Sequence, residues 1–466
     1  MNHMSRKLIK NATIVTMDPI KQIIPKGDIL IEGKIIREIA PSIKADDAEI
    51  INAEGMIVAP GFVDGHRHNW QSLIKMVCVN WTMSEYVSGI KWALGDSWTP
   101  EEIHLSEYIG ALSCLDAGTT TMANFAHNTI SPEHTDAMIE AMLKSGIRCV
   151  FGYSGTNVMW KEMPSVTPYD YADARRAAKK YCSSQDQLLT MAIGGRGPQN
   201  VTMDMALEEI ALAKDLGIMT WLSVGEGLWC ASCPDSVRQL HLKGVVDESI
   251  QFTHLNANSP EEFKIIADTG AKVVMCPEVE LSMGFGWNST RKCIDAGILP
   301  GISTDTPPSV CSDLFTQMKT TLISVRNQMH LEEIANREIS LSMPVNTYDV
   351  LNYATMGGAR AVNMDRKIGS LTVGKEADII FINTDSIQMI PMNGAINAIV
   401  EYATPADVDT VMVAGNIVKQ HGKLVGVDMT ALKRKAEKFR EDYFKKCNVP
   451  YDGLWMPKPY IPDFEI

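Results

Sequence analysis

The sequence MIVAPGFVDGHRHNWQ, residues 56–71, joins an apolar strand pattern to a pair of histidines, His66 and His68. Side chains at positions i and i+2 of a strand point to the same face, so these two imidazoles converge at the end of the strand. In barrels of parallel strands, the carboxyl ends of the strands form the mouth where the chemistry is placed. The stretch therefore predicts a parallel strand that brings two candidate metal-ligating or catalytic histidines to one mouth.

Seven more short apolar runs follow along the chain, and helical patterns lie between most of them. The runs are TTTMANFAH, IRCVFGYS, LLTMAIGG, IMTWLSVGE, IQFTHLN, AKVVMCP and LPGISTD, and two of the helical patterns are PEHTDAMIEAMLKSG and MALEEIALAKDLG. Repeated alternation of strand and helix predicts an α/β fold with a parallel sheet. Eight such units predict closure into a (β/α)8 TIM barrel, which we place at residues 61–365.

Both ends of the chain have a different sequence pattern, in which short predicted strands are separated by glycine turns. Residues 1–60 contain GDILIEGKIIREIA, and residues 366–428 contain IGSLTVGKEADIIFINTD and DVDTVMVAGNIVKQHGKLV. We therefore predict a small composite β-sandwich domain built from both termini.

Residues 429–466 begin with the charged helix pattern TALKRKAEKFREDYFKK and end in an arm rich in proline and aromatic residues. A helix and arm that pack on their own barrel are favoured over an arm that reaches a neighbouring subunit. The reason is that Trp455 and Tyr460 would be exposed on a free arm.

Composition excludes several classes of function. The 466 residues carry 43 Lys and Arg against 56 Asp and Glu, a formal net charge of −13, so neither nucleic acid nor an anionic membrane is an expected partner. Hydrophobic residues make up 45% and charged residues 21%, the balance of a globular protein. The sequence has no signal-peptide pattern and no run of about 18 apolar residues, and its ten cysteines form no disulfide framework. We expect a cytoplasmic protein in a reducing compartment.

Four further polar side chains also end apolar runs. His127 follows TMANFA, Glu226 follows WLSVG, His254 follows IQFT and Asp305 follows LPGIST. One such placement is ordinary, but several at the ends of successive strand patterns are not expected by chance. These residues would meet the histidine pair of the first strand at the barrel mouth.

An ordered series of motifs points to one family. The stretches MIVAPGFVDGHRHNWQ, LSVGEG, FTHLNANSPEEF, CPEVELSMG, GISTDTPPS, ATMGGARAV and IGSLTVGKEADIIF resemble the amidohydrolase superfamily. Within it, the chain is similar to the branch of cytosine deaminase-like, S-adenosylhomocysteine deaminase, and triazine deaminase and chlorohydrolase enzymes, over nearly all of its length. The resemblance implies a metal-dependent (β/α)8 hydrolase with a β-sandwich from both termini. It also implies a small-molecule substrate and a homo-oligomer, either a dimer or a tetramer.

Residue by residue, the resemblance implies one divalent metal ion. His66 and His68 match the first-strand metal ligands, and Asp305 matches the eighth-strand aspartate that ligates the metal and accepts a proton from water. Glu226 matches the glutamate that moves protons to the substrate, and His254 matches a histidine that contacts the water or the substrate. Zinc is the expected ion, with iron, manganese or cobalt as alternatives. The implied reaction is hydrolysis of a C–N bond, by deamination or amide hydrolysis, or of a C–Cl or C–S bond, in a small heterocyclic or aromatic molecule by a metal-activated water.

The sequence departs from the family pattern at Ser223. The family has a metal-ligating histidine three residues before the glutamate that Glu226 matches, and serine is a poor ligand for zinc or ferrous iron. Four alternatives follow: metal binding with His254 recruited as a ligand, weak metal binding, a metal-free lyase or isomerase that uses Glu226, His254 and Asp305, or an inactive binding homologue. Metal retention is favoured, because the other candidate ligands remain in place.

Two further features lie close to this departure in the sequence. Cys230 and Cys233 form a CxxC pair after the same strand. A thiolate that substitutes for the missing ligand is one alternative, and two ordinary loop or helix cysteines are the favoured one. Glu280, a candidate substrate-binding residue, lies where the family commonly has an asparagine. The family-typical substrate contacts at that position therefore stay open.

The remaining candidate substrate contacts are an arginine, a histidine and three aromatic residues. Arg196 ends the fourth strand pattern, where it would hold a substrate carboxylate or form a structural salt bridge. His127 would hydrogen-bond to the substrate or lie in a loop. Trp70, Trp81 and Tyr86 follow the first strand and would form an apolar lid over a planar ring or belong to the core.

Overall fold

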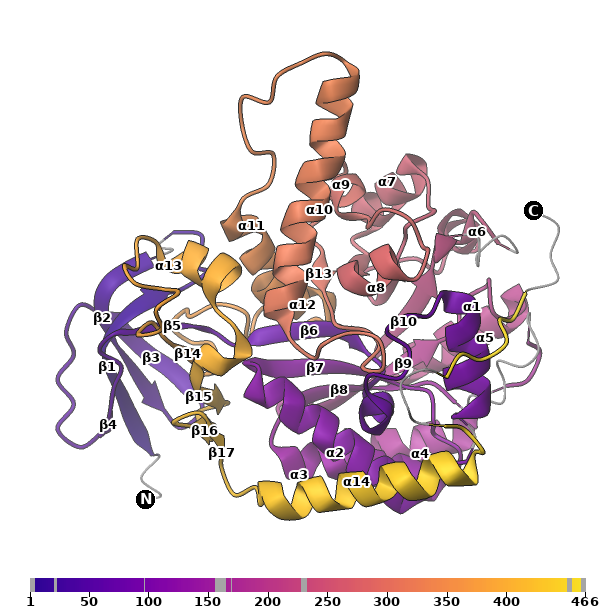
Figure 1. Ribbon diagram of the computed structural model, residues 1–466, viewed down its shortest axis with the longest axis horizontal. Coiled ribbons are helices and arrows are strands. Elements are labelled where there is room, and N and C mark those ends of the chain that lie inside the picture. Colours follow the sequence, from indigo (N-terminus) through magenta and orange to yellow (C-terminus); the bar gives the residue numbers. More distant parts are fainter. Residues whose placement is uncertain are drawn as a thin grey trace.

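The computed structural model describes residues 5–20, 23–95, 97–155, 165–168, 170–227, 233–450 and 455–461. Figure 1 shows a central barrel surrounded by helices, with a separate sheet at one side that combines strands from both ends of the sequence. The α/β barrel and the module from both termini that the sequence predicts are confirmed.

The barrel consists of eight parallel strands that follow one another around the sheet in chain order. Both faces of these strands are covered, and this is why they appear in the sequence as continuous apolar runs. The strands correspond to the eight predicted runs. They are β6 (Phe62–Arg67), β7 (Thr119–Ala126), β8 (Arg148–Tyr153), β9 (Leu189–Gly195), β10 (Met219–Val224), β11 (Ile250–His254), β12 (Lys272–Met275) and β13 (Gly301–Ile302).

Hydrogen bonds between β6 and the segment after β13 close the barrel. The amide of Asp305 donates to the carbonyl of His66 over 3.1 Å, and the amide of His68 donates to the carbonyl of Asp305 over 2.9 Å. The residues that close the barrel are therefore the candidate site residues themselves.

Helices cover the outside of the barrel, and their ends follow local sequence signals. Thr99 and Ser259 begin helices with a capping box, and left-handed glycines end three helices, at Gly146, Gly217 and Gly270. The covering helices are α2 (Pro100–Asp116), α3 (Pro132–Ser145), α4 (Tyr171–Tyr181), α5 (Met203–Leu216), α6 (Ser236–Leu242), α7 (Pro260–Thr269), α8 (Pro277–Ser282), α9 (Thr290–Asp295), α10 (Leu314–Ala335), α11 (Thr347–Asn352), η5 (Tyr353–Gly357) and α12 (Gly358–Ala361). Within the described ranges, no helix combines the length and the apolar character that a membrane crossing requires.

The module from both termini is a nine-stranded mixed sheet. It runs in the order β17-β16-β15-β14-β5-β1-β2-β3, with β4 paired to β1, so β5 and β14 join the two halves of the sequence. The edge strand β3 returns to the segment before β14, because Ile36 donates its amide to Lys375 and Ala377 donates its amide to Lys34. The sheet thus curls around one hydrophobic core. Its strands are β1 (Arg6–Val15), β2 (Ile23–Glu32), β3 (Ile35–Ala40), β4 (Glu49–Asn52), β5 (Met56–Pro60), β14 (Ile379–Asn383), β15 (Val408–Val413), β16 (Asn416–Gln420) and β17 (Lys423–Leu424), and the short helices α13 (Ala395–Asn397), η6 (Ala398–Tyr402) and η7 (Pro405–Asp407) connect β14 to β15.

The first apolar run of the sequence is divided between the two sheets. Residues 56–60 form β5 of the module, and residues 62–67 form β6 of the barrel. The single residue between them is Gly61, where a Cβ atom would lie only 2.2 Å from the side chain of Thr120. The single strand predicted over this run is therefore corrected to two, because close packing at Gly61 lets the chain pass from one sheet to the other.

The C-terminal helix α14 (Met429–Lys446) packs along the outside of the barrel (Figure 1). Its residues Phe439 and Tyr443 lie against the ring of Trp98, at centroid distances of 5.0 and 4.7 Å. The arm after α14 returns to the segment between β6 and α2, where Trp455 contacts Trp81. The described part of the tail thus packs on its own chain.

Candidate active site

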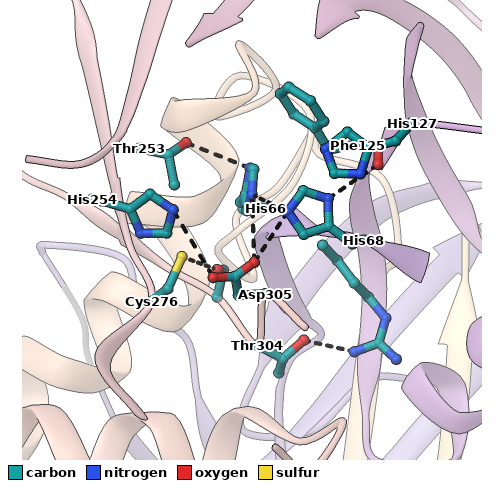
Figure 2. Close-up of polar contacts among 12 residues, drawn as sticks. His66, His68, Phe125, His127, Thr253, His254, Cys276, Thr304 and Asp305 are labelled. Carbon is teal, nitrogen blue, oxygen red and sulfur yellow. Dashed lines mark hydrogen bonds and ion pairs between the residues drawn. The ribbon is translucent and has the colours of Figure 1, made fainter. Parts of the chain in front are cut away.

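His66 and His68 lie at the carboxyl end of β6, and Asp305 follows β13 across the closure of the barrel. The Nε2 atoms of the two histidines are 3.3 Å apart, and Asp305 Oδ1 lies 3.7 Å from His66 Nε2 and 3.3 Å from His68 Nε2. Figure 2 shows the three side chains pointing toward one another. All three are buried, and one ligand atom from each lies within 4.8 Å of the others, a spacing that can hold one metal ion.

Arg67, between the two histidines, points to the opposite side of the strand. Its guanidinium donates to Thr304 Oγ1 over 2.7 Å and to Ser312 Oγ over 2.8 Å. Thr304 immediately precedes Asp305 in the chain. The buried contact between Arg67 and Thr304 therefore fixes the end of β6 against the segment that carries Asp305 (Figure 2). The alternation of side chains along β6 thus gives one face to the site and the other to its support.

The donor atoms of the site are arranged as a cation requires. Burial lowers the pKa of His66 and His68 well below the usual value, so both imidazoles are neutral. His68 Nδ1 lies 3.3 Å from the carbonyl of Phe125, which only accepts, so the proton is assigned to Nδ1 and the Nε2 lone pair faces Asp305. Asp305 Oδ1 is buried without a hydrogen-bond partner among the described residues. An uncompensated arrangement of this kind is costly, and a divalent cation satisfies all three groups.

Asp305 and His254 are held in backbone conformations that ordinary residues rarely adopt. Their φ angles are +55° and +77°. Such strain is found mainly at functional sites. Burial is also the main cause that raises the pKa of Asp305, to about 7, although the charge on His254 opposes it.

His254 lies between three carboxylates. Its Nδ1 is 3.2 Å from Glu280 Oε1, and its Nε2 is 3.6 Å from Glu226 Oε1 and 4.0 Å from Asp305 Oδ2. Burial lowers the pKa of His254, but the hydrogen bond to Glu280 and the surrounding negative charges outweigh it and raise the pKa to about 9. His254 therefore carries a proton toward the carboxylates, and it lies outside the group formed by the other two histidines and Asp305.

Glu280 supports His254 from behind the cavity. Its Oε1 accepts the backbone amide of Cys276 over 2.7 Å as well as the His254 contact. Burial raises the pKa of the Cys276 thiol well above the usual value, so this neighbouring thiol stays protonated. The position of Glu280 therefore favours support of His254 over the predicted contact with substrate.

Glu226 and Ser223 lie at the end of β10, and both line the central cavity. Burial is the main cause that raises the pKa of Glu226, and the charges of His254 and Lys91 oppose it. Ser223 pairs in register with Thr253 of the neighbouring strand, so the hydroxyl is at the mouth where the family has a histidine. Cys230 lies outside the described residues. Burial raises the pKa of the Cys233 thiol to about 11, which disfavours a thiolate ligand there.

The predicted substrate contacts fall into two groups. His127 lines the cavity and stacks on His68 at a centroid distance of 4.1 Å, and Trp70 donates its indole N–H to His127 Nδ1 over 3.3 Å. Arg196 instead pairs with buried Glu209, with its Nε 2.8 Å from Glu209 Oε1. Of the two alternatives for Arg196, a substrate contact or a structural salt bridge, the structure contains the salt bridge.

Of the three aromatic residues predicted as a lid or as core, all belong to the hydrophobic core, and one of them also lines the cavity. Tyr86 lines the cavity, together with Met83 and Val87, from the segment formed by η1 (Asn69–Ile74), α1 (Met83–Tyr86) and the π-helix η2 (Val87–Ala93). Trp81 lies behind this segment, against Trp455. The opposite wall is apolar as well, with Val279, Met283 and Phe285.

Sequence reasoning missed Lys91. This lysine of η2 lines the cavity, and its Nζ lies 3.0 Å from both ring nitrogens of His127. Burial lowers the pKa of Lys91 to about 7, although Glu226 and Asp305 act to raise it. The available signal was a single charged residue in the otherwise apolar stretch VSGIKWAL, residues 87–94.

Comparison with known proteins agrees with this geometry. The Amidohydrolase family model matches residues 57–418. The chain is 24% identical over 443 residues to a 5-methylthioadenosine/S-adenosylhomocysteine deaminase of Thermoanaerobacter pseudethanolicus, covering 92% of this chain and 97% of the relative. It is 24% identical over 447 residues to a 5'-deoxyadenosine deaminase of Methanobrevibacter smithii, covering 93% of this chain and 97% of the relative.

Solved structures share the fold. An adenosine deaminase from Xanthomonas campestris with bound zinc superposes with a TM-score of 0.83 at 21% identity, over 95% of this chain and 99% of the other. An atrazine chlorohydrolase from Arthrobacter aurescens complexed with zinc gives a TM-score of 0.82 at 19% identity, over 92% and 99%. With the family model matching most of its length, the chain belongs to the amidohydrolase family.

Proposed function

We propose that the protein is a metal-dependent hydrolase that deaminates a small heterocyclic molecule. One observation carries the proposal: Asp305 Oδ1, buried without a hydrogen-bond partner among the described residues, faces the lone pair of His68 Nε2 at 3.3 Å, beside Glu226 and His254. The deaminase names of the relatives support the C–N bond as the one that is broken, and their nucleoside substrates support a heterocycle.

The chain's own residues suit one divalent ion. His66, His68 and Asp305 would hold it, with zinc as the first expectation and iron, manganese or cobalt as alternatives. His254 would complete the set only if its imidazole turned from Glu226 toward the ion. When bound, the ion lowers the pKa of a water molecule and so supplies a nucleophile near neutral pH.

Two side chains would then move protons, and a third would orient the reacting oxygen. Asp305, whose pKa burial raises to about 7, accepts the proton of the attacking water. Glu226, whose pKa burial also raises, donates a proton to the ring nitrogen or to the leaving amine. His254, held by Glu280, directs its Nε2 proton at the reacting oxygen and keeps it oriented.

The metal-free lyase or isomerase and the inactive binding protein are less well supported. A metal-free site would leave two neutral imidazoles and a buried carboxylate oxygen facing one another. The deaminase names of the relatives favour an enzyme over a pure binding protein. A cytoplasmic location and a dimer or tetramer remain part of the proposal.

The test combines metal analysis with turnover. Purified protein from metal-replete medium should contain about one equivalent of a divalent metal and should release ammonia from members of a panel of adenosine derivatives, aminopyrimidines and aminotriazines. Asp305→Asn and Glu226→Gln should lose at least 100-fold in kcat, because general acid–base catalysis contributes about 100- to 10,000-fold. Asp204→Asn, at an exposed position of α5, is the matched control. Metal well below stoichiometry together with no turnover by the wild type would contradict the proposal.

A further inference from the structure

The cavity has a cationic side chain that the proposed reaction does not use. Lys91 is the only lysine or arginine among the described residues that line it, and it is 4% exposed. Its neighbours in the wall include Tyr86, whose ring centroid lies 5.9 Å from Lys91 Nζ. An amine placed this deep is costly in the absence of a function, since burial disfavours its charged form.

Lys91 lies in a helix of unusual geometry. Lys91 lies in the π-helix η2, which adds a residue to the helical turn, and such turns occur frequently at functional sites. The next residue, Trp92, packs outward against Tyr460 of the C-terminal arm at a centroid distance of 4.7 Å. The Trp92 contact holds one side of η2 against the arm, and Lys91 lines the cavity from another side of the same helix.

One imidazole ring separates Lys91 from the candidate metal ligands. The ring of His127 stacks on His68 at 4.1 Å, and its nitrogens lie 3.0 Å from Lys91 Nζ. The lysine and the metal-ligating atoms therefore flank the same end of the cavity. A group bound to Lys91 would belong to the same small molecule as the carbon under attack.

The remaining walls suit the body of a flat molecule. Met83 and Val87 lie on one side of the cavity, and Met283 and Phe285 line another part of its wall. Apolar walls around a few placed polar groups are typical of sites for small ligands. His254, the other cationic side chain in the cavity wall, is already held by Glu280, so Lys91 marks where a negative group of the ligand would be bound.

We propose that Lys91 binds a carboxylate of the substrate, so that the preferred substrates are planar amino-heterocycles with a carboxylate beside the amino-bearing carbon. The inference rests on the proposed deamination for the identity of the reacting carbon. The binding of the anion itself does not depend on that reaction, so the two can fail separately.

The first test measures binding with benzoate and its neutral isostere benzamide on the metal-loaded protein. Titration calorimetry should show benzoate bound at least tenfold more tightly than benzamide. Lys91→Met should remove this preference and leave benzamide affinity within threefold, whereas Lys91→Arg should retain part of it. Lys264→Met, which removes a lysine from an exposed pair with Asp268, is the control and should bind like wild type. A benzoate preference that persists in Lys91→Met would overturn the inference, because the carboxylate would then be bound by the metal or by another group.

The second test measures turnover with 4-aminopyrimidine-5-carboxylate and 4-aminopyrimidine-5-carboxamide. Wild type should have a higher kcat/KM for the acid, and Lys91→Met should reduce kcat/KM for the acid at least tenfold more than for the amide. An equal loss for both compounds would overturn the anion site and leave the deaminase proposal standing. A benzoate preference that requires Lys91, found in a protein that deaminates neither these two compounds nor any member of the panel, would support the anion site and contradict the deaminase proposal.

Discussion

The Nε2 atoms of His66 and His68 lie 3.3 Å apart, and both face Asp305 Oδ1. The same three residues exchange the backbone hydrogen bonds that close the barrel between its first and last strands. The backbone hydrogen bonds that close the barrel thus also place the three candidate ligands next to one another. Two neutral imidazoles and a carboxylate at this spacing are destabilising without a cation and stabilising with one.

Removal of the metal should therefore lower the stability of the protein. An ion present at a thousandfold excess over its dissociation constant stabilises the folded state by about 4 kcal/mol. We expect a chelator to lower the midpoint of thermal unfolding of the wild type by several degrees. The same treatment should leave the midpoint of His68→Ala unchanged, because this variant lacks a ligand. Equal midpoints for untreated and chelated wild type, with no metal found by elemental analysis, would contradict the prediction.

Ser223 offers a direct test of the missing ligand. Ser223→His should increase metal affinity at least tenfold, since a third imidazole at this position of the mouth brings the site closer to full tetrahedral coordination. Ser223→Ala is the matched variant: unchanged affinity indicates that the hydroxyl is not a ligand, and reduced affinity indicates that it is. The measurement is competition with a chelator of known affinity. A histidine variant that binds metal no better than wild type would show that the ion lies out of reach of β10.

The contact between His254 and Glu280 should control the pH dependence of the reaction. The hydrogen bond to Glu280 and nearby carboxylates raise the pKa of His254 to about 9 against the effect of burial. Activity that requires protonated His254 is present below that value and is lost as the pH rises through it. In Glu280→Gln the negative charge is gone, so the pKa of His254 falls and the alkaline limb of kcat moves to lower pH. An unshifted limb, measured on the same substrate and metal, would show that Glu280 has only a structural role.

The same contact contributes to folding. The pKa of His254 in the folded protein is above the unfolded value of about 6.5. The stabilising effect of the contact with Glu280 is therefore complete below a pH of about 6.5 and disappears as the pH rises toward 9. Glu280→Gln should therefore cost more stability at pH 6 than at pH 9 relative to wild type. Urea unfolding at the two pH values checks this sign.

The sequence was informative where chemistry depends on strand ends and uninformative where it depends on packing between distant segments. His66, Glu226, His254 and Asp305 end apolar runs, and parallel strands bring their carboxyl ends to one mouth, so their meeting could be predicted from pattern alone. The inward position of Lys91 depends instead on how η2 packs against the barrel and against the C-terminal arm. No local pattern reports such a contact.

The partners of buried ion pairs could not be predicted from the sequence pattern either. Arg196 ends a strand pattern like the catalytic candidates, but a carboxylate from α5 neutralises it. The division of the first apolar run at Gly61 is also a packing effect, because it depends on the approach of Thr120 from the next strand. Alternation and composition describe one segment at a time and do not reveal which partner it meets.

The junction between barrel and terminal module depends on Arg148. Its guanidinium, at the start of β8, lies 2.8 Å from Asp378 Oδ1 and 2.6 Å from Glu376 Oε2, all buried. Arg148→Met should destabilise the protein by about 3–5 kcal/mol, because it removes the buried counter-charge of Asp378 and leaves Glu376 with Lys34 alone. Arg175→Met, which breaks the exposed pair with Asp215, should cost about 0–1 kcal/mol.

The pH dependence of this junction has a definite sign. Burial acts to raise the pKa of Glu376, but Arg148 and Lys34 outweigh it and hold the pKa below its usual value. The stabilising effect is therefore present above the unfolded pKa of about 4.3 and is lost as the pH falls through the folded value. The difference between wild type and Arg148→Met, measured by urea unfolding, should be larger at pH 7 than at pH 4. A constant difference would show that the loss comes from packing and not from charge.

The C-terminal arm should control substrate binding through the lid segment. Trp455 packs on Trp81 at 5.0 Å, Tyr460 packs on Trp92 at 4.7 Å, and the amide of Tyr460 donates to the carbonyl of Ser84 over 3.2 Å. These contacts hold the outer side of the segment whose inner side carries Tyr86 and Lys91 into the cavity.

A chain that ends at Val449 keeps α14 and its contacts with Trp98, so the barrel should remain folded, with unchanged circular dichroism and metal content. Each aromatic pair contributes about 0.5–1.5 kcal/mol beyond its buried area, so loss of both pairs should raise KM by about tenfold or more, whereas kcat should change much less. The double variant Trp455→Ala, Tyr460→Ala should reproduce most of this effect in the full-length chain, and Lys458→Ala in the same arm is its control. If KM is the same in the shortened chain and in the double variant as in wild type, the arm does not position the lid. If kcat falls while KM is constant, the arm acts on the reacting groups, because the loss is then in a step after binding.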